Sequence, residues 1–267
     1  MTTLPKITKK QQEIIRFLYT FRFLNRIQIQ ALLKHKDYRR INEWLKDLTE
    51  KEYLNRIYSN TFIGKTIPAV YYVGINGIRY LKTLEQYPES QIRKLYREDK
   101  REDSFIERSM FLAEICLQLG KATDEKKVFK VATKTDLADP GYWYNFLTEY
   151  NVDMIFIKES RTGKSMPKYY IVQYLDSSLP RLSCLKRIRK CFELYLSSEW
   201  ESETDKPFPL LLFVCEKLPT LIHLKRYTRR LFNEEYEDLD DLKFQFTTKD
   251  QVLESGFTSE IWEEIKS

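Results

Sequence analysis

The run PFPLLLFVCE, at positions 207–216, is the feature that most limits how this chain can fold. Its six consecutive apolar residues, 210–215, suit one strand. They are far fewer than the roughly 20 residues that a membrane-spanning helix needs. A strand without a polar face is buried on both faces, so helices must cover the sheet that contains it. The sequence therefore predicts an α/β region around this run.

The rest of the second half fits such a sheet. Strands are predicted where β-branched and aromatic residues gather, and helices where apolar residues recur every three or four positions. The predicted strands are KVFKVAT, NVDMIFIKE, KYYIVQYLD and LKFQFTT, and the predicted helices are FIERSMFLAEICLQLG, SLPRLSCLKRIRKCFELYLSS and LPTLIHLKRYTRRLFNEE. In the second of these helices, Ile188 and Phe192 lie on the apolar face and Arg187 is expected to point away from it. The order α-β-β-β-α-β-α-β indicates helices packed on a mixed sheet.

The first 87 residues show a different pattern, in which three helical stretches precede two β-rich runs. The helices are predicted in ITKKQQEIIRFLYTFRFL, NRIQIQALLK and HKDYRRINEWLKDLTEKEYL, and the strands in EYLNRIYS and IPAVYYVG. Thr8 with Gln11, and Asn25 with Gln28, have the spacing of capping boxes that begin the first two helices. This order is that of a winged helix-turn-helix, whose third helix enters the major groove and whose hairpin forms the wing.

Charge favours DNA as the partner of this first part. Residues 1–100 carry 20 Lys and Arg against 10 Asp and Glu, whereas residues 101–267 carry 25 against 29. Such an excess on one part of a chain indicates a polyanionic partner, although a solvated basic surface explains it almost equally well. Arginine can read guanine, asparagine can read adenine, and lysine can neutralise phosphate. The residues expected to contact duplex DNA are Arg39, Arg40, Asn42 and Lys46 on the third helix, Lys65 at the wing tip, and Arg22 and Arg26 near the start of the second helix.

A polar segment, EQYPESQIRKLYREDKREDS, separates the two parts and is expected to be an exposed, helical connector. We therefore predict a winged helix over residues 1–87, a connector over 88–102 and an α/β domain over 103–267, which makes the whole chain α+β. The last region contains an acidic stretch, NEEYEDLDDLKFQF, which is either a solvated surface helix or a contact for a partner protein.

Cysteine and histidine usage gives no sign of a metal site. The four cysteines form no C-x-x-C pair, and the two histidines are too few for a spaced Cys/His zinc site. The cysteines are expected to be reduced core residues. The first residues, MTTLPKITKKQQ, lack the apolar stretch of a signal peptide, so a cytoplasmic location without a membrane partner is expected.

Two predicted strands carry polar residues where chemistry could occur. Asp153 opens the strand NVDMIFIKE, and Gln173 lies inside the otherwise apolar strand KYYIVQYLD. This arrangement resembles the PD-(D/E)xK nuclease fold. The resemblance implies an aspartate and a second carboxylate that hold Mg²⁺, and a lysine two positions later that supports the attacking water. Gln173 and Leu175 occupy those last two positions, and Glu107 on the preceding helix matches a glutamate that some members use.

These departures argue against cleavage. A neutral amide is a poor ligand for Mg²⁺ and leucine cannot orient a water molecule, so no catalytic residue, metal or cofactor is expected. Asp176 could supply a carboxylate only through a register shift, and it would then face the other side of the strand. We interpret Gln173 as a polar residue near a solvated sheet edge or groove, and Asp153 as structural.

The whole chain resembles the replication-relaxation family of plasmids and integrative conjugative elements. The resemblance covers roughly residues 5–230 and is carried by ITKKQQEIIRFLYTFRFLNRIQIQALL, YRRINEWLKDLTEKEYLNRIY, AVYYVGINGIRYL and IVQYLDSS. The family commonly has an acidic residue where Gln173 stands. The resemblance implies a non-enzymatic accessory protein that binds double-stranded DNA during replication or conjugative transfer, beside a relaxase or helicase. A homodimer would suit paired half-sites. A metal-dependent nuclease, a transcriptional repressor and a protein adaptor stay open as alternatives.

Overall fold

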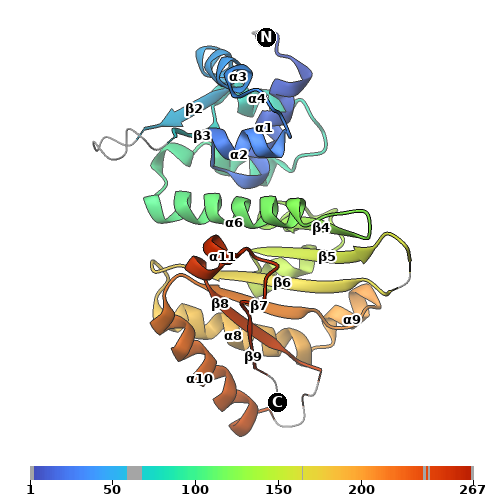
Figure 1. Cartoon of the computed structure of the whole chain (residues 1–267). Coiled ribbons are helices and arrows are strands. Elements are labelled where there is room, and N and C mark those ends of the chain that lie inside the picture. Colours follow the sequence, from blue (N-terminus) through green and yellow to red (C-terminus); the bar gives the residue numbers. More distant parts are fainter. Residues whose placement is uncertain (1–2, 59–67, 164, 237–238, 240, 266–267) are drawn as a thin grey trace. The chain divides into compact units, whose positions relative to one another are not determined.

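The computed structural model describes residues 3–58, 68–163, 165–236, 239 and 241–265. The chain divides into two compact units (Figure 1). Unit 1 comprises Met1–Leu117 and Ala138–Tyr142, and unit 2 comprises Gln118–Leu137 and Trp143–Ser267. Helices and strands occur in both units, which confirms the expected mixture of α and β structure with a mixed sheet.

Unit 1 contains a small antiparallel sheet with the strand order β1-β3-β2. Its elements are α1 (Lys9–Phe21), β1 (Leu24–Asn25), α2 (Arg26–Leu32), α3 (Tyr38–Glu50), β2 (Leu54–Ile57), β3 (Val70–Val73), α4 (Ile75–Lys82), α5 (Glu89–Leu95) and the short 3-10 helix η2 (Glu98–Lys100). Helix α6 (Asp103–Lys121) begins in unit 1 and ends in unit 2.

The first two helices begin at the capping residues that the sequence predicts. The Thr8 hydroxyl accepts the N–H of Gln11 at 3.3 Å, and the Gln11 side chain accepts the N–H of Thr8 at 2.8 Å. Asn25 and Gln28 make the same exchange at the start of α2, at 3.0 and 3.3 Å. Each exchange satisfies two backbone N–H groups, one at the cap and one in the first turn. Both capping predictions are confirmed.

The apolar core of unit 1 includes a segment that the sequence did not suggest. On α3, Ile41 and Leu45 face this core at the predicted spacing. The range 88–102 differs from the exposed connector that we expected, since Ile92 and Leu95 of α5 are each 2% exposed and pack in the same core. Two apolar residues three positions apart are enough to give a short helix one buried face.

Gly77 on α4 lies against the backbone between α3 and β2. A Cβ atom at this position would be 2.4 Å from the carbonyl oxygen of Tyr53 and 2.7 Å from Cγ1 of Val73. The Tyr53 carbonyl accepts the N–H of Gly74 at 2.8 Å, which holds it in place.

We therefore expect Gly77→Ala to lower the free energy of unfolding by about 1–3 kcal/mol, the usual cost of overpacking. Urea denaturation measures this change. Gly120→Ala is the matched control, because Gly120 is also helical and no atom lies within 4 Å of a Cβ there. The helix propensity of alanine should make the control neutral or stabilising. Equal effects at the two glycines would contradict the steric explanation.

Unit 2 is built on a mixed sheet with the strand order β4-β5-β6-β7-β8-β9 (Figure 1). Its elements are β4 (Lys127–Thr133), α7 (Lys134–Leu137), the 3-10 helix η3 (Asn145–Tyr150), β5 (Met154–Ser160), β6 (Lys168–Leu175), α8 (Arg181–Leu196), α9 (Glu199–Thr204), β7 (Leu210–Cys215), α10 (Leu218–Glu234), β8 (Phe244–Thr248), α11 (Lys249–Ser255) and β9 (Glu263–Ile265). Strands β4, β5 and β6 form an antiparallel meander, and β6, β7 and β8 run parallel. Helices α8 and α10 are the crossovers between the parallel strands.

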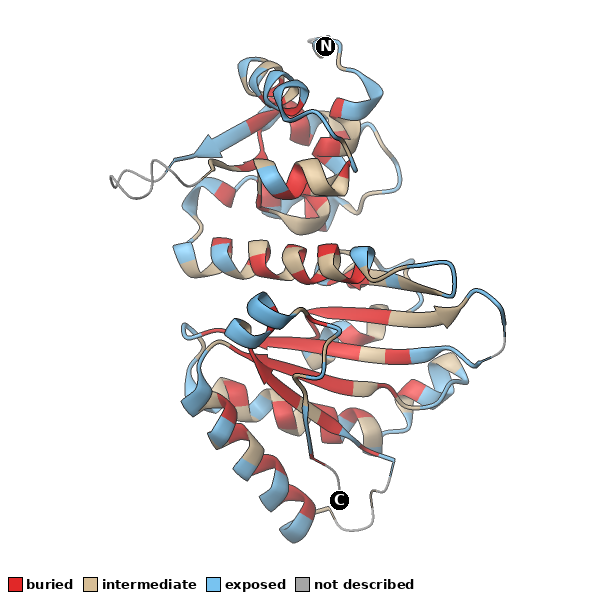
Figure 2. Ribbon diagram, viewed as in Figure 1, coloured by how far each residue is buried: buried red, intermediate tan, exposed pale blue. Residues whose placement is uncertain are grey.

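The apolar run 210–215 forms β7, between β6 and β8, and its residues from Leu211 to Cys215 are buried. Figure 2 shows that buried residues are concentrated along the middle strands of this sheet. The prediction that this run is a strand buried on both faces is confirmed. The four cysteines are reduced thiols, and burial raises the pKa of the Cys215 thiol to about 12, which keeps it protonated.

The acidic stretch 233–246 is not a surface helix. Helix α10 ends at Glu234, and Phe244 and Phe246 are fully buried on β8. Alternate aromatic residues are typical of a strand, and this signal outweighs the acidic composition. Residues 237, 238 and 240 of the stretch lie outside the described part of the chain. In that part, no helix combines the length and apolar character needed to cross a bilayer.

Candidate functional site

Asp153 is held inside unit 2 by an ion pair. Its backbone N–H donates to the carbonyl of Val172 at 3.2 Å, directly before β5 begins. Its Oδ2 accepts the N–H of Tyr174 and a hydrogen bond from Nη1 of Arg187, both at 2.9 Å. The side chains of Asp153 and Arg187 are only 1% and 12% exposed. The expectation that Arg187 points away from the core is therefore wrong, because its long side chain reaches back to the carboxylate.

Gln173 is completely buried on β6, which lies between β5 and β7. Its Nε2 lies 3.5 Å from Sγ of Cys191 on α8. Its Oε1 is buried without a hydrogen-bond partner in the described structure. The expectation of a solvated sheet edge is therefore wrong, because a central strand covered by a helix has no access to water. Leu175 is 1% exposed and fills the lysine position with a core side chain.

The buried amide gives a direct prediction. A polar group buried without a partner costs about 1–3 kcal/mol in proteins. We expect Gln173→Met, which has a similar volume, to raise the free energy of unfolding by about 1 kcal/mol. Gln173→Glu should lower it instead, because it places a second carboxylate in the interior beside Asp153. Urea denaturation of both variants checks the prediction, and a stabilising glutamate would show that the site accepts negative charge.

The other nuclease-like positions do not form a metal site. Glu107 is exposed on the part of α6 that belongs to unit 1. Asp176 follows β6, and its Oδ1 accepts the N–H of Ser178 at 3.1 Å. Nearby, Glu216 accepts the N–H of Ser177 and lies 3.8 Å from the amine of Lys249. Among the described residues, no three His, Cys, Asp or Glu side chains converge as metal ligands.

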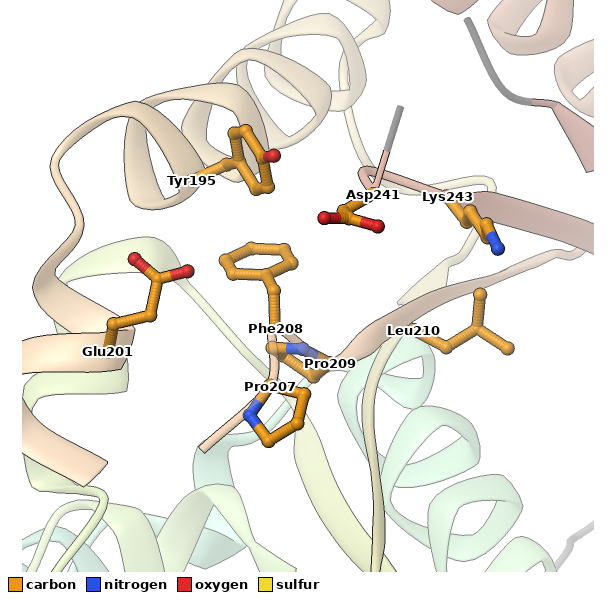
Figure 3. A pocket seen from close by; sticks show the side chains of 8 residues that line it. All are labelled: Tyr195, Glu201, Pro207, Phe208, Pro209, Leu210, Asp241 and Lys243. Atoms are coloured by element: carbon orange, nitrogen blue, oxygen red, sulfur yellow. The ribbon is translucent and has the colours of Figure 1, made fainter. Parts of the chain in front are cut away.

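Unit 2 also has a hollow of about 360 Å³ where β7 begins (Figure 3). Its lining residues are Tyr195, Glu201, Pro207, Phe208, Pro209, Leu210, Asp241 and Lys243. The rings of Tyr195 and Phe208 pack edge to face, with their centres 4.9 Å apart. The hollow lies at the amino end of a parallel strand, whereas ligands of open α/β sheets bind at the carboxyl ends. Its position therefore does not suggest a catalytic pocket.

The third helix of unit 1 presents a row of polar side chains to solvent. Arg39, Arg40, Asn42 and Lys46 are all exposed on α3. Nη1 of Arg40 lies 3.0 Å from Glu43, and Lys46 lies 3.8 Å from Glu50. All four of these paired side chains are more than half exposed, and such surface pairs contribute about 1 kcal/mol or less. The cations can therefore exchange these partners for phosphate at little cost.

A second group of basic and aromatic side chains extends this surface to α2 and β2. We call it the basic–aromatic strip, and it consists of Arg26, Tyr38, Arg39, Arg56, Tyr58 and Tyr71. The guanidinium groups of Arg26 and Arg39 are each 5.9 Å from the ring centre of Tyr38. Arg56 is 5.0 Å from the ring centre of Tyr58. Tyr38 and Tyr58 are 51% and 55% exposed as whole residues, so both can contact a ligand.

Tyr71 on β3 connects the two halves of the strip. Burial raises the pKa of its phenol, and the nearby guanidinium groups of Arg56 and Arg26 act in the opposite direction. The strand register agrees, because β3 places Tyr71 opposite Arg56 of β2 and opposite Leu24 of β1, directly before α2. The sequence analysis identified Arg26 and Arg39 but missed Arg56 and the tyrosines. The alternation of Arg56 and Tyr58 in the run NRIYS is a local signal that could have indicated them.

Two of the expected DNA contacts need separate comment. Arg22 is a correction, since its side chain is 12% exposed and pairs with Glu98, which is fully buried. Burial raises the pKa of Glu98, while Arg22 and Arg101 act against this shift. The Arg22 side chain thus pairs with a buried carboxylate inside unit 1 and is not presented to phosphate. Lys65, expected at the wing tip, lies outside the described residues.

Searches of protein-family models, of curated proteins and of solved structures found no match for this chain. The class of protein is therefore inferred from its own residues. The exposed cations of α3 and the basic–aromatic strip together form a candidate nucleic-acid interface on unit 1.

Proposed function

We propose that this chain binds duplex DNA through a winged helix in unit 1 and does not cleave it. The observation that carries the proposal is the row of exposed basic side chains on α3, together with the basic–aromatic strip beside it. In this proposal α3 lies in the major groove, and the strip contacts the sugar–phosphate backbone.

The order of elements supports the winged-helix part of the proposal. The elements occur in the order α1-β1-α2-α3-β2-β3, with the antiparallel strand order β1-β3-β2, and this order is compatible with a winged helix. Helix α3 buries Ile41, Leu45 and Leu48 and leaves its opposite face in solvent. A recognition helix needs this division, because one face must be anchored while the other enters the groove.

The state of Asp153 supports binding without cleavage. A carboxylate that binds Mg²⁺ must present its oxygens to the cation. Here Asp153 is buried and its Oδ2 is occupied by Arg187, while Gln173 and Leu175 supply neither a second carboxylate nor a lysine. We extend the proposal to an accessory role in replication or transfer of a mobile element, with a relaxase or helicase as partner, as the family resemblance implies.

The proposal is tested by selecting bound duplexes from a random pool and then measuring affinity against salt. If Arg26, Lys46 and Arg56 each contact one phosphate while Arg39 and Arg40 contact bases, log K should fall with log[salt] with a slope of about −2.7. Absence of binding at low salt, or binding that is independent of salt, would exclude the proposal.

The part of the proposal that concerns cleavage has its own test. Plasmid DNA is incubated with the full chain and Mg²⁺ or Mn²⁺, and the products are separated on a gel. We expect the plasmid to stay supercoiled. Cleavage that is lost in Asp153→Ala would overturn this part and leave DNA binding itself unaffected.

A further inference from the structure

Unit 2 has a concentration of positive charge of its own. Helices α8 and α10 pack against each other and cover the same part of the sheet (Figure 1). Helix α8 carries five Lys and Arg residues, α10 carries four, and each helix has only one Glu. They thus hold nine of the 25 basic residues in 101–267 and two of its 29 acidic ones. The two helices are therefore basic within an otherwise acidic half of the chain.

Three arginines and one histidine lie along α10 and at the start of α8 and form what we call the α10 patch: Arg181, His223, Arg226 and Arg230. Nε and Nη2 of Arg181, at the start of α8, lie 2.9 and 3.1 Å from the two ring nitrogens of His223. Arg226 and Arg230 lie one and two turns further along α10. Burial and the charges of Arg181, Arg230 and Arg226 all lower the pKa of His223. The patch thus sets three arginines around an imidazole whose neutral form is favoured.

The patch has little acidic compensation. Within the described part of the chain, no carboxylate forms an ion pair with Arg181 or Arg226. Arg230 lies 3.8 Å from Glu234, with both side chains more than half exposed, so this pair is weak. By contrast, Arg189 and Lys225 on the same two helices have close acidic partners. Converging cations without an anion are electrostatically unfavourable unless a ligand supplies the negative charge.

The spacing and chemistry of the patch suit a phosphate backbone. Arginine matches phosphate with two parallel hydrogen bonds, which lysine cannot do. From His223 to Arg230 the helix rises by about 10 Å, and the phosphates of one strand are spaced by about 3.4 Å along a duplex. The patch can therefore follow about three successive phosphates. The apolar face of α10, which includes Leu224 and Leu231, is buried in unit 2, so it cannot insert into a bilayer.

We propose that the α10 patch is a second binding site for the phosphate backbone of DNA, distinct from the interface on unit 1. The inference rests on the proposed function for the choice of duplex DNA as the ligand. Two sites on one chain raise the effective concentration of DNA at each, so the second site adds affinity without adding sequence preference.

The test compares salt dependence in full-length variants with a labelled duplex several helical turns long. We expect Arg226→Gln with Arg230→Gln to reduce the slope of log K against log[salt] by about 1.8, the value for two lost phosphate contacts. Lys126→Gln with Lys130→Gln is the matched control, because these exposed lysines carry the same charge elsewhere on unit 2. It should leave the slope unchanged. Arg226→Lys with Arg230→Lys keeps both positive charges and should keep the slope. A reduced slope in the glutamine variant alone is then due to the lost charge and not to misfolding.

The outcomes of this test distinguish the α10 patch from the proposed interface on unit 1. A slope that is unchanged in the Arg226/Arg230 glutamine variant overturns the second site. The second site is also overturned if that variant loses binding to phosphatidylserine vesicles but still binds DNA, because this result would assign the patch to a membrane surface. If Arg39→Gln with Arg40→Gln has no effect on affinity while the α10 variant reduces the slope, the proposed function of unit 1 fails and the second site stands.

His223 adds a readout that depends on pH. Arg181 from α8 and Arg226 and Arg230 from α10 lower its pKa in the free protein, and a bound phosphate should raise it again. The bound form then takes up a proton, so affinity should increase as the pH falls from about 7.5 to about 6. His223→Gln should lose this increase, with affinity measured at both pH values. An equal increase in the variant would assign the effect to another group, such as His35, and count against the site.

Discussion

Replacing Arg187 with leucine is expected to lower the free energy of unfolding of the chain by about 3–5 kcal/mol. The substitution leaves the carboxylate of Asp153 in the interior of unit 2 without its guanidinium partner, and a buried charge that loses its partner is costly. The backbone N–H of Tyr174 still donates to this carboxylate, but one hydrogen bond does not replace a neutralising charge. Urea denaturation followed by circular dichroism measures the loss.

The same helix offers a matched control. Arg189→Leu removes an arginine from a pair with Glu235 in which the side chains are 41% and 37% exposed, so it should cost much less. Removing both charges of the buried pair, with Asp153→Leu and Arg187→Leu together, should recover much of the stability lost in Arg187→Leu. If Arg187→Leu is no more destabilising than Arg189→Leu, the pair is not the buried interaction that its geometry indicates.

The second large effect is expected in DNA binding. If Arg39 and Arg40 each form a bidentate contact with a base, replacing either with alanine should weaken binding to the selected sequence by about 5- to 150-fold. Binding to unrelated sequences should weaken less, because only the charge is lost there. Fluorescence anisotropy with the selected duplex and a scrambled one measures both effects.

The control for this prediction is also in unit 1. Arg93 on α5 is exposed and pairs with Glu89 at 3.1 Å, and it lies outside the proposed interface. Arg93→Ala should change affinity little. Retention of both affinity and sequence preference in Arg39→Ala with Arg40→Ala would show that α3 does not read the DNA.

Local signals predicted most of the elements. The capping pairs at Thr8 and Asn25 gave the starts of α1 and α2, and the apolar run 210–215 gave the central strand β7. The sequence analysis expected helical structure where α5 lies but missed its burial, because a polar composition concealed Ile92 and Leu95. It also missed β9, whose three residues are too few to show an alternating pattern.

The candidate site was predicted less completely, because much of it depends on residues far apart in sequence. The exposed face of α3 follows from helical spacing, and its Arg39 and Lys46 were predicted correctly to be exposed. The pair of Arg187 with Asp153 and the pair of Arg22 with Glu98 join positions 34 and 76 residues apart. Periodicity carries no information about such partners, so it could not show that these two arginines turn inward.

The buried pair of Asp153 and Arg187 also determines how far this chain is from a metal-dependent nuclease. Gaining a metal site at this place would require a carboxylate at Gln173, a lysine at Leu175 and removal of Arg187. Each change alone puts an unmatched charge into the interior or leaves one there, so each intermediate is expected to be less stable than the present chain. A route to such a metal site by single substitutions is therefore expected to pass through proteins that are less stable at every step.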